Sequence, residues 1–210
     1  MLASWEHSTQ ITCLVDDHRA NRICIGMNVQ NHPMYSLGTL RSQPALERPE
    51  LLADPVRAAL DTWDLASKVE VVEIDPEHAD TATLCEVAQV PAESGANCVI
   101  ISGKRAGEER LAAVLVPAHR RADVNNAVKR LLDVRKCSFH PHERAVEETG
   151  MEYGGITPIG VPASWRVLID PGVGDIDVCV IGSGVRRSKI LVPGQVLLNL
   201  PGAEVVPLAL

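Results

Sequence analysis

The residues of this chain that are best placed to do chemistry lie in a glycine-rich segment at residues 149–160, with the sequence TGMEYGGITPIG. Glycine adopts positive φ angles and lets another molecule approach the backbone closely, while Pro158 fixes its own φ and restrains Thr157. The segment therefore predicts a stiff loop with exposed amides, which suits a small polar ligand or an oxyanion. The amides that could bind a developing negative charge belong to Gly154, Gly155 and Ile156. The alternative is an ordinary tight connection between a helix and a strand.

Three side chains of the same loop could contact a bound ligand, namely Tyr153, Thr157 and Pro158. Tyr153 offers an aromatic ring, and Thr157 offers a hydroxyl. A small pocket with one hydroxyl excludes large side chains by steric clash but distinguishes small ones only weakly. Thr157 could therefore select among small ligands.

A second group of candidates occupies residues 182–189, with the sequence GSGVRRSK. The small residues Gly182, Ser183 and Gly184 predict a concave stretch of backbone lined with amides. The adjacent Arg186 and Arg187 suit phosphate groups, which arginine binds through paired hydrogen bonds.

Two further residues could belong to a site or have a plain structural role. His78 lies in a predicted loop, where it could act as a general acid or base, contact an adenine, or simply be exposed. Asp170 ends a predicted strand, where it could hold an amide or hydroxyl of the site or cap the turn at Pro171-Gly172. No Ser-His-Asp set is evident along the chain.

The six cysteines do not form a recognisable metal or disulfide pattern, since none lies in a CxxC pair. Cys137, His140 and His142 could form half of a metal site, but their spacing fits the end of a strand meeting a turn better. Cys98 lies in an apolar strand, which favours a core thiol over a nucleophile. We expect reduced thiols, no metal and no cofactor.

The bulk composition is that of one soluble domain, with 46% hydrophobic and 22% charged residues. No apolar run reaches the ~18 residues of a membrane span, and the N-terminus lacks the features of a secretory signal. We therefore expect a cytoplasmic protein without membrane contacts.

The charge is distributed unevenly, although the net charge is −7. Residues 1–95 hold 6 basic and 15 acidic side chains, whereas residues 96–210 hold 14 basic and 12 acidic ones. The basic residues of the second part often come in adjacent pairs, which could bind phosphates or form solvated turns and helix faces. A nucleic acid bound by this chain should therefore bind modestly and in a salt-sensitive way.

Local signals place the secondary structure. Helices are predicted at residues 54–65, where Asp54 precedes a proline, at 80–88 behind Asp80 or Thr81, at 123–132 behind Asp123, at 141–150 ending on Gly150, and after Pro193-Gly194. Strands are predicted at residues 69–74, 98–102, 110–116, 136–139, 166–169, 177–181, 188–192 and 204–207, the second and third forming a hairpin that turns at Gly103 and Gly107.

These elements predict an α+β fold, in which a single domain holds a mixed, curled β-sheet with helices packed outside. Residues 1–33 show little periodicity, so we expect an irregular N-terminal extension there, with the folded domain at residues 34–210. Because Met27 and Met34 could each be a start codon, a chain beginning at Met34 should keep full stability.

Several segments together resemble the YbaK/prolyl-tRNA synthetase-associated domain family. The likeness is carried in order by residues 95–101, 111–117, 149–160, 167–170 and 180–187, and it spans roughly residues 54–207. It implies the same α+β architecture and the hydrolysis of a small mischarged amino acid, such as alanine, cysteine or serine, from the acceptor end of tRNA. The tRNA implied is that for proline, and a hydroxyl of its terminal adenosine would take part in the reaction.

The chain departs from the family pattern at two positions. Most members carry an activity-associated lysine where Asn97 aligns, and many carry an acidic residue where Lys189 aligns. Asn97 could position a carbonyl or a water, and Lys189 could supply the missing ammonium from another strand or face solvent. We therefore expect a free-standing aminoacyl-tRNA deacylase. The alternatives are a member that binds aminoacyl-tRNA, a nucleotide or a protein without hydrolysis, and a hydrolase of another aminoacyl ester or thioester.

Overall fold

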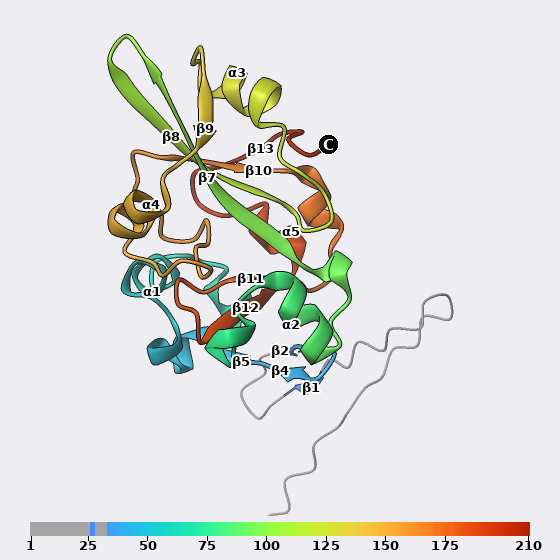
Figure 1. Ribbon diagram of the computed structural model, residues 1–210. Coiled ribbons are helices and arrows are strands. Elements are labelled where there is room, and N and C mark those ends of the chain that lie inside the picture. The colour runs from blue at the N-terminus through green and yellow to red at the C-terminus, as the bar shows by residue number, and fades with distance from the viewer. Residues whose placement is uncertain (1–25, 28–32) are drawn as a thin grey trace, which may run out of the picture.

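The computed structural model describes residues 26–27 and 33–210, and Figure 1 shows their arrangement. The predicted N-terminal extension at residues 1–33 therefore falls largely outside the described residues. Within the described part, β1 (Gly26–Met27) pairs with β2 (Pro33–Met34) in a short antiparallel ribbon that crosses the predicted boundary. A second ribbon, β3 (Ser36–Leu37) with β4 (Leu40–Arg41), leads into the main body.

A five-stranded mixed sheet forms the upper half of the molecule in Figure 1, in the order β13-β10-β8-β7-β9. Its strands are β7 (Ala96–Arg105), β8 (Glu108–Pro117), β9 (Cys137–Phe139), β10 (Arg166–Ile169) and β13 (Ala203–Val205). The strand β10 pairs in parallel with β8 and β13, whereas β7 pairs antiparallel with β8 and β9.

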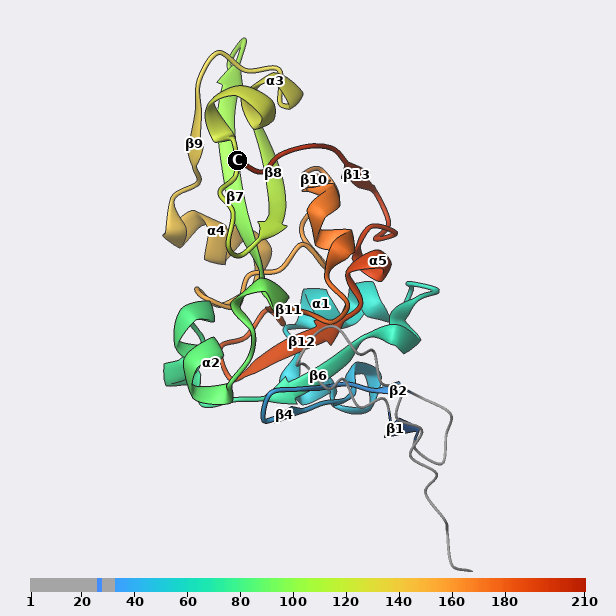
Figure 2. The same cartoon turned by 90° about the vertical axis from the view of Figure 1, so that its right-hand side faces the viewer.

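The β7–β8 hairpin is longer than its sequence signal predicts, and it extends away from the rest of the fold (Figure 2). Its turn is made by Ala106 and Gly107, whose φ angles are 52° and 89°. Two successive positive φ angles give the twist that matches a two-residue hairpin. Gly103 lies within β7 instead of the predicted turn, where a Cβ would come 2.6 Å from the carbonyl oxygen of Lys136.

A four-stranded antiparallel sheet forms the lower half, in the order β11-β12-β6-β5. Its strands are β5 (Gln43–Pro44), β6 (Glu70–Glu73), β11 (Cys179–Gly182) and β12 (Ser188–Val192). A bridge between Gly95 and Val180 joins the start of β7 to β11. The strands thus divide between two sheets, because β12 pairs with β6 from a distant part of the sequence.

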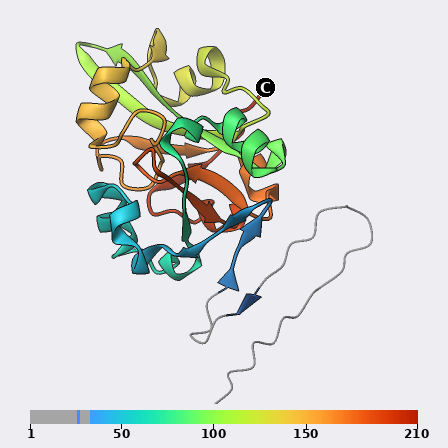
Figure 3. The same ribbon diagram turned by 60° about the horizontal axis from the view of Figure 1, so that its bottom comes forward.

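The helices lie around the two sheets (Figure 3), and they are α1 (Asp54–Leu60), α2 (Thr81–Ala88), α3 (Lys129–Leu131), α4 (His142–Thr149) and α5 (Gly194–Leu197). The Asp80 carboxylate caps α2 by accepting hydrogen bonds from the amides of Ala82 and Thr83. Gly150 ends α4 in the left-handed conformation, as its sequence predicts. Asp54 is the first residue of α1 and does not cap it.

Aliphatic side chains fill the interior, as the low aromatic content of 3% requires. The fully buried residues include Leu115, Leu168, Ile169, Ile190 and Leu191, which come from central strands of both sheets. The α+β fold class and the single domain are therefore confirmed. Of the helices in residues 26–27 and 33–210, none is long and apolar enough to cross a membrane.

Candidate functional site

A cavity of about 640 Å³ opens between α2, the start of β7, the loop after α4, the end of β11 and the start of β12. This volume lies in the range of sites for small molecules and cofactors. Its polar lining comes from separate parts of the chain and consists of Asp80, Thr81, Asn97, Cys98, His119, His140, His142, Tyr153 and Lys189.

The cavity exists because β9 is shorter than its partner strand. The ten residues of β7 pair with β8 along their whole length, but β9 covers only residues 101–103. The edge of β7 at residues 96–99 is therefore not covered by β9, and these residues line the cavity. Asn97 lies on this edge, and its Oδ1 accepts a hydrogen bond of 3.1 Å from the Thr81 hydroxyl on α2.

The glycine-rich loop and the loop after β11 are joined mainly through their backbones. The amide of Glu152 donates to the Gly184 carbonyl at 2.8 Å, and the amide of Gly184 donates to the Gly155 carbonyl at 2.8 Å. The amide of Gly155 turns inward to the Glu152 carbonyl at 2.9 Å. The concavity predicted at residues 182–184 thus holds the glycine-rich loop. The amides of Gly155 and Gly184 donate to carbonyl oxygens of the protein and are not available to a ligand.

This contact leaves no room for side chains at two of the glycines. A Cβ on Gly182 would lie 2.2 Å from the carbonyl oxygen of Gly155, and a Cβ on Gly155 would lie 2.7 Å from that of Val185. Both distances are far below van der Waals contact. The glycines are therefore required by the close approach of two chains.

The predicted phosphate-binding arginines are part of the same junction. Arg186 donates to the carbonyl oxygens of Tyr153 at 3.1 Å and Pro76 at 2.9 Å, and its amide donates to the Glu152 carboxylate at 2.6 Å. Arg187 is exposed, and its guanidinium donates to the carbonyl oxygen of Glu50. Both guanidinium groups thus hold backbone segments together.

Lys189 is the buried cation of the cavity, with 4% of its surface exposed. It lies on β12, opposite Val72 of β6 and Gly182 of β11, and its Nζ donates to the Gly154 carbonyl at 3.2 Å. An ammonium group carries three donors, so the remaining two can serve a ligand. Among the described residues, no carboxylate forms an ion pair with it.

Burial lowers the pKa of Lys189 to about 8, because removal from water disfavours the charged form. The negative charge of Asp80 acts in the opposite direction, and the nearby Arg186 guanidinium adds to the lowering of the pKa. The Lys189 ammonium is therefore more acidic than that of a surface lysine. A perturbed cation inside a cavity is characteristic of functional sites.

Two amides of the glycine-rich loop remain available to a ligand. The amides of Gly154 and Ile156 make no hydrogen bond to any residue of the described chain, and both residues line the cavity. The structure therefore gathers Gly154, Ile156, Asn97, Lys189, Tyr153 and Gly182 at the cavity.

Nine of the predicted site residues do not line the cavity. Four of them, Gly155, Gly184, Arg186 and Arg187, belong to the joined loops described above. Thr157 is fully buried with no hydrogen-bond partner for its hydroxyl among the described residues, and Pro158 faces a second cavity near Trp63 and Trp165. Ser183 is buried and bonds to Ser188.

The last two of these residues are Asp170 and His78. The Asp170 carboxylate accepts hydrogen bonds from the amides of Gly172, Leu208 and Ala209, so it caps its turn and holds the C-terminal segment. His78 is half-buried and borders the cavity only through its neighbour Ala79.

Several lining residues are not among the predicted site residues. The sequence predicts Asp80 only as a helix cap, whereas the structure also places its carboxylate close enough to Lys189 to act on the pKa of that lysine. His140 and His142 line the cavity, but the described residues contain no group of three ligands that could hold a metal ion. Cys98 also lines it, and burial raises the pKa of its thiol to about 12, which makes it a poor nucleophile.

Comparisons with known proteins match the chain to one family and to several solved structures. A model of the aminoacyl-tRNA editing domain matches residues 75–200, which include every residue that lines the cavity. No curated protein matches the chain.

The solved structures share the fold at low sequence identity. The crystal structure of a candidate trans-editing enzyme for prolyl-tRNA synthetase is 22% identical, with a TM-score of 0.64 over 75% of this chain and 96% of that one. The hypothetical protein APE2540 is 18% identical, with a TM-score of 0.62 over 72% of this chain and 99% of that one.

Proposed function

This chain belongs to the aminoacyl-tRNA editing domain family, and from that premise we propose that it hydrolyses a small mischarged amino acid, such as alanine, cysteine or serine, from tRNA for proline. A deacylase-type role is what the family supports. The choice of substrate rests on the trans-editing relative, whose partner enzyme is prolyl-tRNA synthetase. The cavity of about 640 Å³ has room for a terminal nucleoside with its amino acid.

The observation that carries the proposal is the position of Lys189. Its ammonium is buried in the cavity that Asn97 also lines, and two of its three donors are unused by the protein. A buried cation with spare donors can stabilise a negative charge that develops in a reaction, because surrounding water no longer screens it. The Lys189 ammonium therefore offers the charge that Asn97 cannot supply.

We assign the chemistry of ester hydrolysis to this group of donors. When water adds to the ester carbonyl, the carbonyl oxygen becomes negatively charged, and Lys189 with the free amides of Gly154 and Ile156 would bind it. Collapse of this intermediate breaks the ester bond, which leaves the free amino acid and the ribose hydroxyl of the tRNA. The Asn97 amide would orient the carbonyl or the attacking water.

Deacylation of proline tRNA charged in turn with alanine, cysteine, serine and 2-aminobutyrate tests this proposal. Removal of one oxyanion donor typically costs ~10²–10³ in rate, so Lys189→Met should lower kcat by about a hundredfold while the protein stays folded. The matched control is Lys68→Met, an exposed lysine outside the cavity, which should keep the wild-type rate. Equal rates for both variants would contradict the role of Lys189 and leave the loop amides as the main donors.

A second candidate function is binding of aminoacyl-tRNA without hydrolysis. The neutral Asn97 at the position where relatives carry a lysine favours it. No turnover of any charged tRNA, combined with retained binding, would select this function. In that case Asn97→Lys should introduce turnover.

A further inference from the structure

Among the described residues, the exposed aromatic side chains lie at one place. The described residues include five aromatic residues, and three of them are buried, namely Tyr35, Trp63 and Trp165. The other two are Phe139, which is 61% exposed, and Tyr153, which is 57% exposed. Both line the mouth of the cavity that holds Lys189. Exposed apolar surface that gathers at a cavity marks a ligand-binding groove more often than single scattered residues do.

The geometry of the two residues suits a flat ligand. Tyr153 already packs against the ring of His142, with ring centroids 4.6 Å apart and an angle of 36° between the planes. Phe139 ends the edge strand β9, where no further strand covers it. Stacking of an aromatic ring on an unpaired base is the main way in which proteins hold single-stranded RNA.

Charges that lead along the chain toward Phe139 point to the same kind of ligand. Arg135 and Lys136 directly precede β9 and are exposed. Neither side chain forms an ion pair or a hydrogen bond with another residue in the described ranges 26–27 and 33–210. Lys136 directly precedes β9 and Phe139 ends it, so at about 3.3 Å per residue the two residues are roughly 10 Å apart along the chain. The free cations therefore lie just before one end of this edge strand, and the exposed ring lies at its other end.

We propose that Phe139 and the Tyr153–His142 pair form a stacking site for the unpaired bases at the 3′ end of an RNA, with Arg135 and Lys136 binding the phosphates that lead to it. This inference rests on the proposed function, because it names how the acceptor end enters the cavity. The site recognises unpaired bases through their flat faces and carries no base-specific contact.

Binding of uncharged RNA hairpins tests the site without any need for turnover. One fluorescein-labelled hairpin ends in four unpaired nucleotides, and a second carries abasic residues at the same four positions. Phe139→Ala and Tyr153→Ala should each weaken binding of the first hairpin about tenfold, which is within the range of one lost stacked base. Both residues are exposed, so neither truncation should change the melting temperature appreciably.

Matched controls separate stacking from general binding. Phe139→Trp should retain the wild-type affinity, because it keeps a flat ring. Leu46→Ala removes an apolar side chain that is 44% exposed but lies outside the cavity, and it should have no effect. The double variant Arg135→Gln with Lys136→Gln should weaken binding of both hairpins equally and reduce the dependence of affinity on salt, since phosphate contacts do not read bases.

Two outcomes would overturn the inference. The first is equal affinity of the wild type for the normal and abasic hairpins. The second is unchanged RNA binding by Phe139→Ala together with loss of self-association in sedimentation, which would assign the rim to a contact between copies of this chain. A protein that hydrolyses charged tRNA yet shows either outcome retains the proposed function, whereas base-dependent binding without hydrolysis retains the stacking site alone.

Discussion

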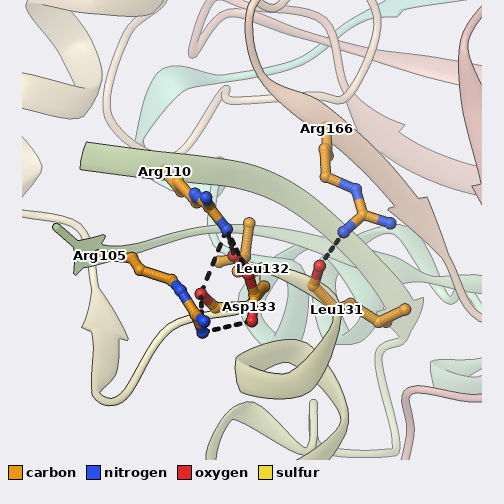
Figure 4. A network of polar contacts seen from close by, with 6 residues as sticks. All are labelled: Arg105, Arg110, Leu131, Leu132, Asp133 and Arg166. Carbon is orange, nitrogen blue, oxygen red and sulfur yellow. Dashed lines mark hydrogen bonds and ion pairs between the residues drawn. The ribbon is translucent and has the colours of Figure 1, made fainter. Parts of the chain in front are cut away.

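The tip of the β7–β8 hairpin and the cavity both use cations, but they use them in opposite ways. At the tip, Arg105 and Arg110 share the carboxylate of Asp133, and Arg110 also donates to the Leu132 carbonyl at 3.1 Å (Figure 4). Nearby, Arg166 donates to the Leu131 carbonyl and pairs with the Glu204 carboxylate. In this arginine cluster, each guanidinium pairs with a carboxylate and donates to a carbonyl oxygen. The side chains of these ion pairs remain 33–58% exposed.

The cavity holds a cation without a carboxylate partner. Lys189 is almost fully buried, and the only hydrogen bond of its ammonium group to a described residue goes to the Gly154 carbonyl. Asp80 acts on it only through the electrostatic field of its carboxylate. Removal of a charge from water costs several kcal/mol when no partner compensates it. The protein carries this cost at Lys189 and avoids it at the arginine cluster. A buried cation with unused hydrogen-bond donors indicates a functional role. Surface cations whose donors are paired within the protein indicate a structural role.

Of the changes that test this comparison, a substitution at the contact between the two loops should have the largest effect on stability and activity. Gly182→Ala places a Cβ 2.2 Å from the Gly155 carbonyl oxygen, so the loops must separate and Lys189 loses its acceptor. We expect a loss of about 3 kcal/mol in the free energy of unfolding, near the upper end for overpacking, together with loss of deacylation. Urea unfolding and the deacylation assay measure these two effects.

The control lies at the hairpin tip, where Gly107 has a φ of 89° and a Cβ would meet nothing within 4 Å. Asparagine tolerates this backbone conformation, so Gly107→Asn should cost less than ~1 kcal/mol and leave deacylation intact. A mild effect of Gly182→Ala would show that the close contact of the two loops is not needed for the site.

A smaller effect is expected from pH, and its sign follows from the lowered pKa of Lys189. The folded protein releases this proton near pH 8, whereas the unfolded chain keeps it up to the ordinary value of 10.5. Between these values the unfolded state binds more protons, so the free energy of unfolding should rise with pH. Deacylation should fall over the same range, because the ammonium that binds the oxyanion is lost.

Urea unfolding of the wild type and of Lys189→Met on both sides of pH 8 isolates this contribution. The buried thiols of Cys98 and Cys179 have raised pKa values of about 12 and act in the opposite direction above pH 9, but they are common to both proteins. The free energy of unfolding of the wild type should therefore rise with pH relative to that of Lys189→Met. A constant difference would mean that Lys189 titrates like an exposed lysine.

The smallest effect is expected at the arginine cluster itself. Asp133→Asn removes the shared negative charge but keeps a residue that tolerates the φ of 52° found there. Exposed ion pairs contribute ~0–1 kcal/mol, so the melting temperature should drop by only a few degrees and deacylation should change less than twofold. A tenfold loss of activity would instead show that the hairpin tip is coupled to the cavity.

Local signals in the sequence predict much of this fold. The cap at Asp80, the end of α4 at Gly150 and the β7–β8 hairpin follow from short-range rules, and the structure has all three. The division into two sheets does not follow from such rules. It depends on the pairing of Lys189 with Val72, two residues that are remote in sequence, and no local pattern encodes that choice.

The candidate site shows the same limit more sharply. The sequence indicates that the loop at residues 149–160 has accessible amides. It does not indicate that the backbone of Gly184 forms hydrogen bonds with the Glu152 amide and the Gly155 carbonyl of that loop. It also indicates that Asp80 caps a helix, but not that this helix places the carboxylate beside Lys189. Residue type reports what a group can do, whereas the tertiary contact decides what it is left free to do.

The backbone contact between the two loops has a consequence for how such a site can change in evolution. The hydrogen bonds of Gly155 and Gly184 join main-chain atoms, so no particular side chain is needed to hold the two loops together. The loops can approach only because glycine has no side chain at the contact. Side chains around this contact can then be exchanged without dismantling it. A lineage could lose a lysine on one strand and gain another across the cavity while the site keeps its shape.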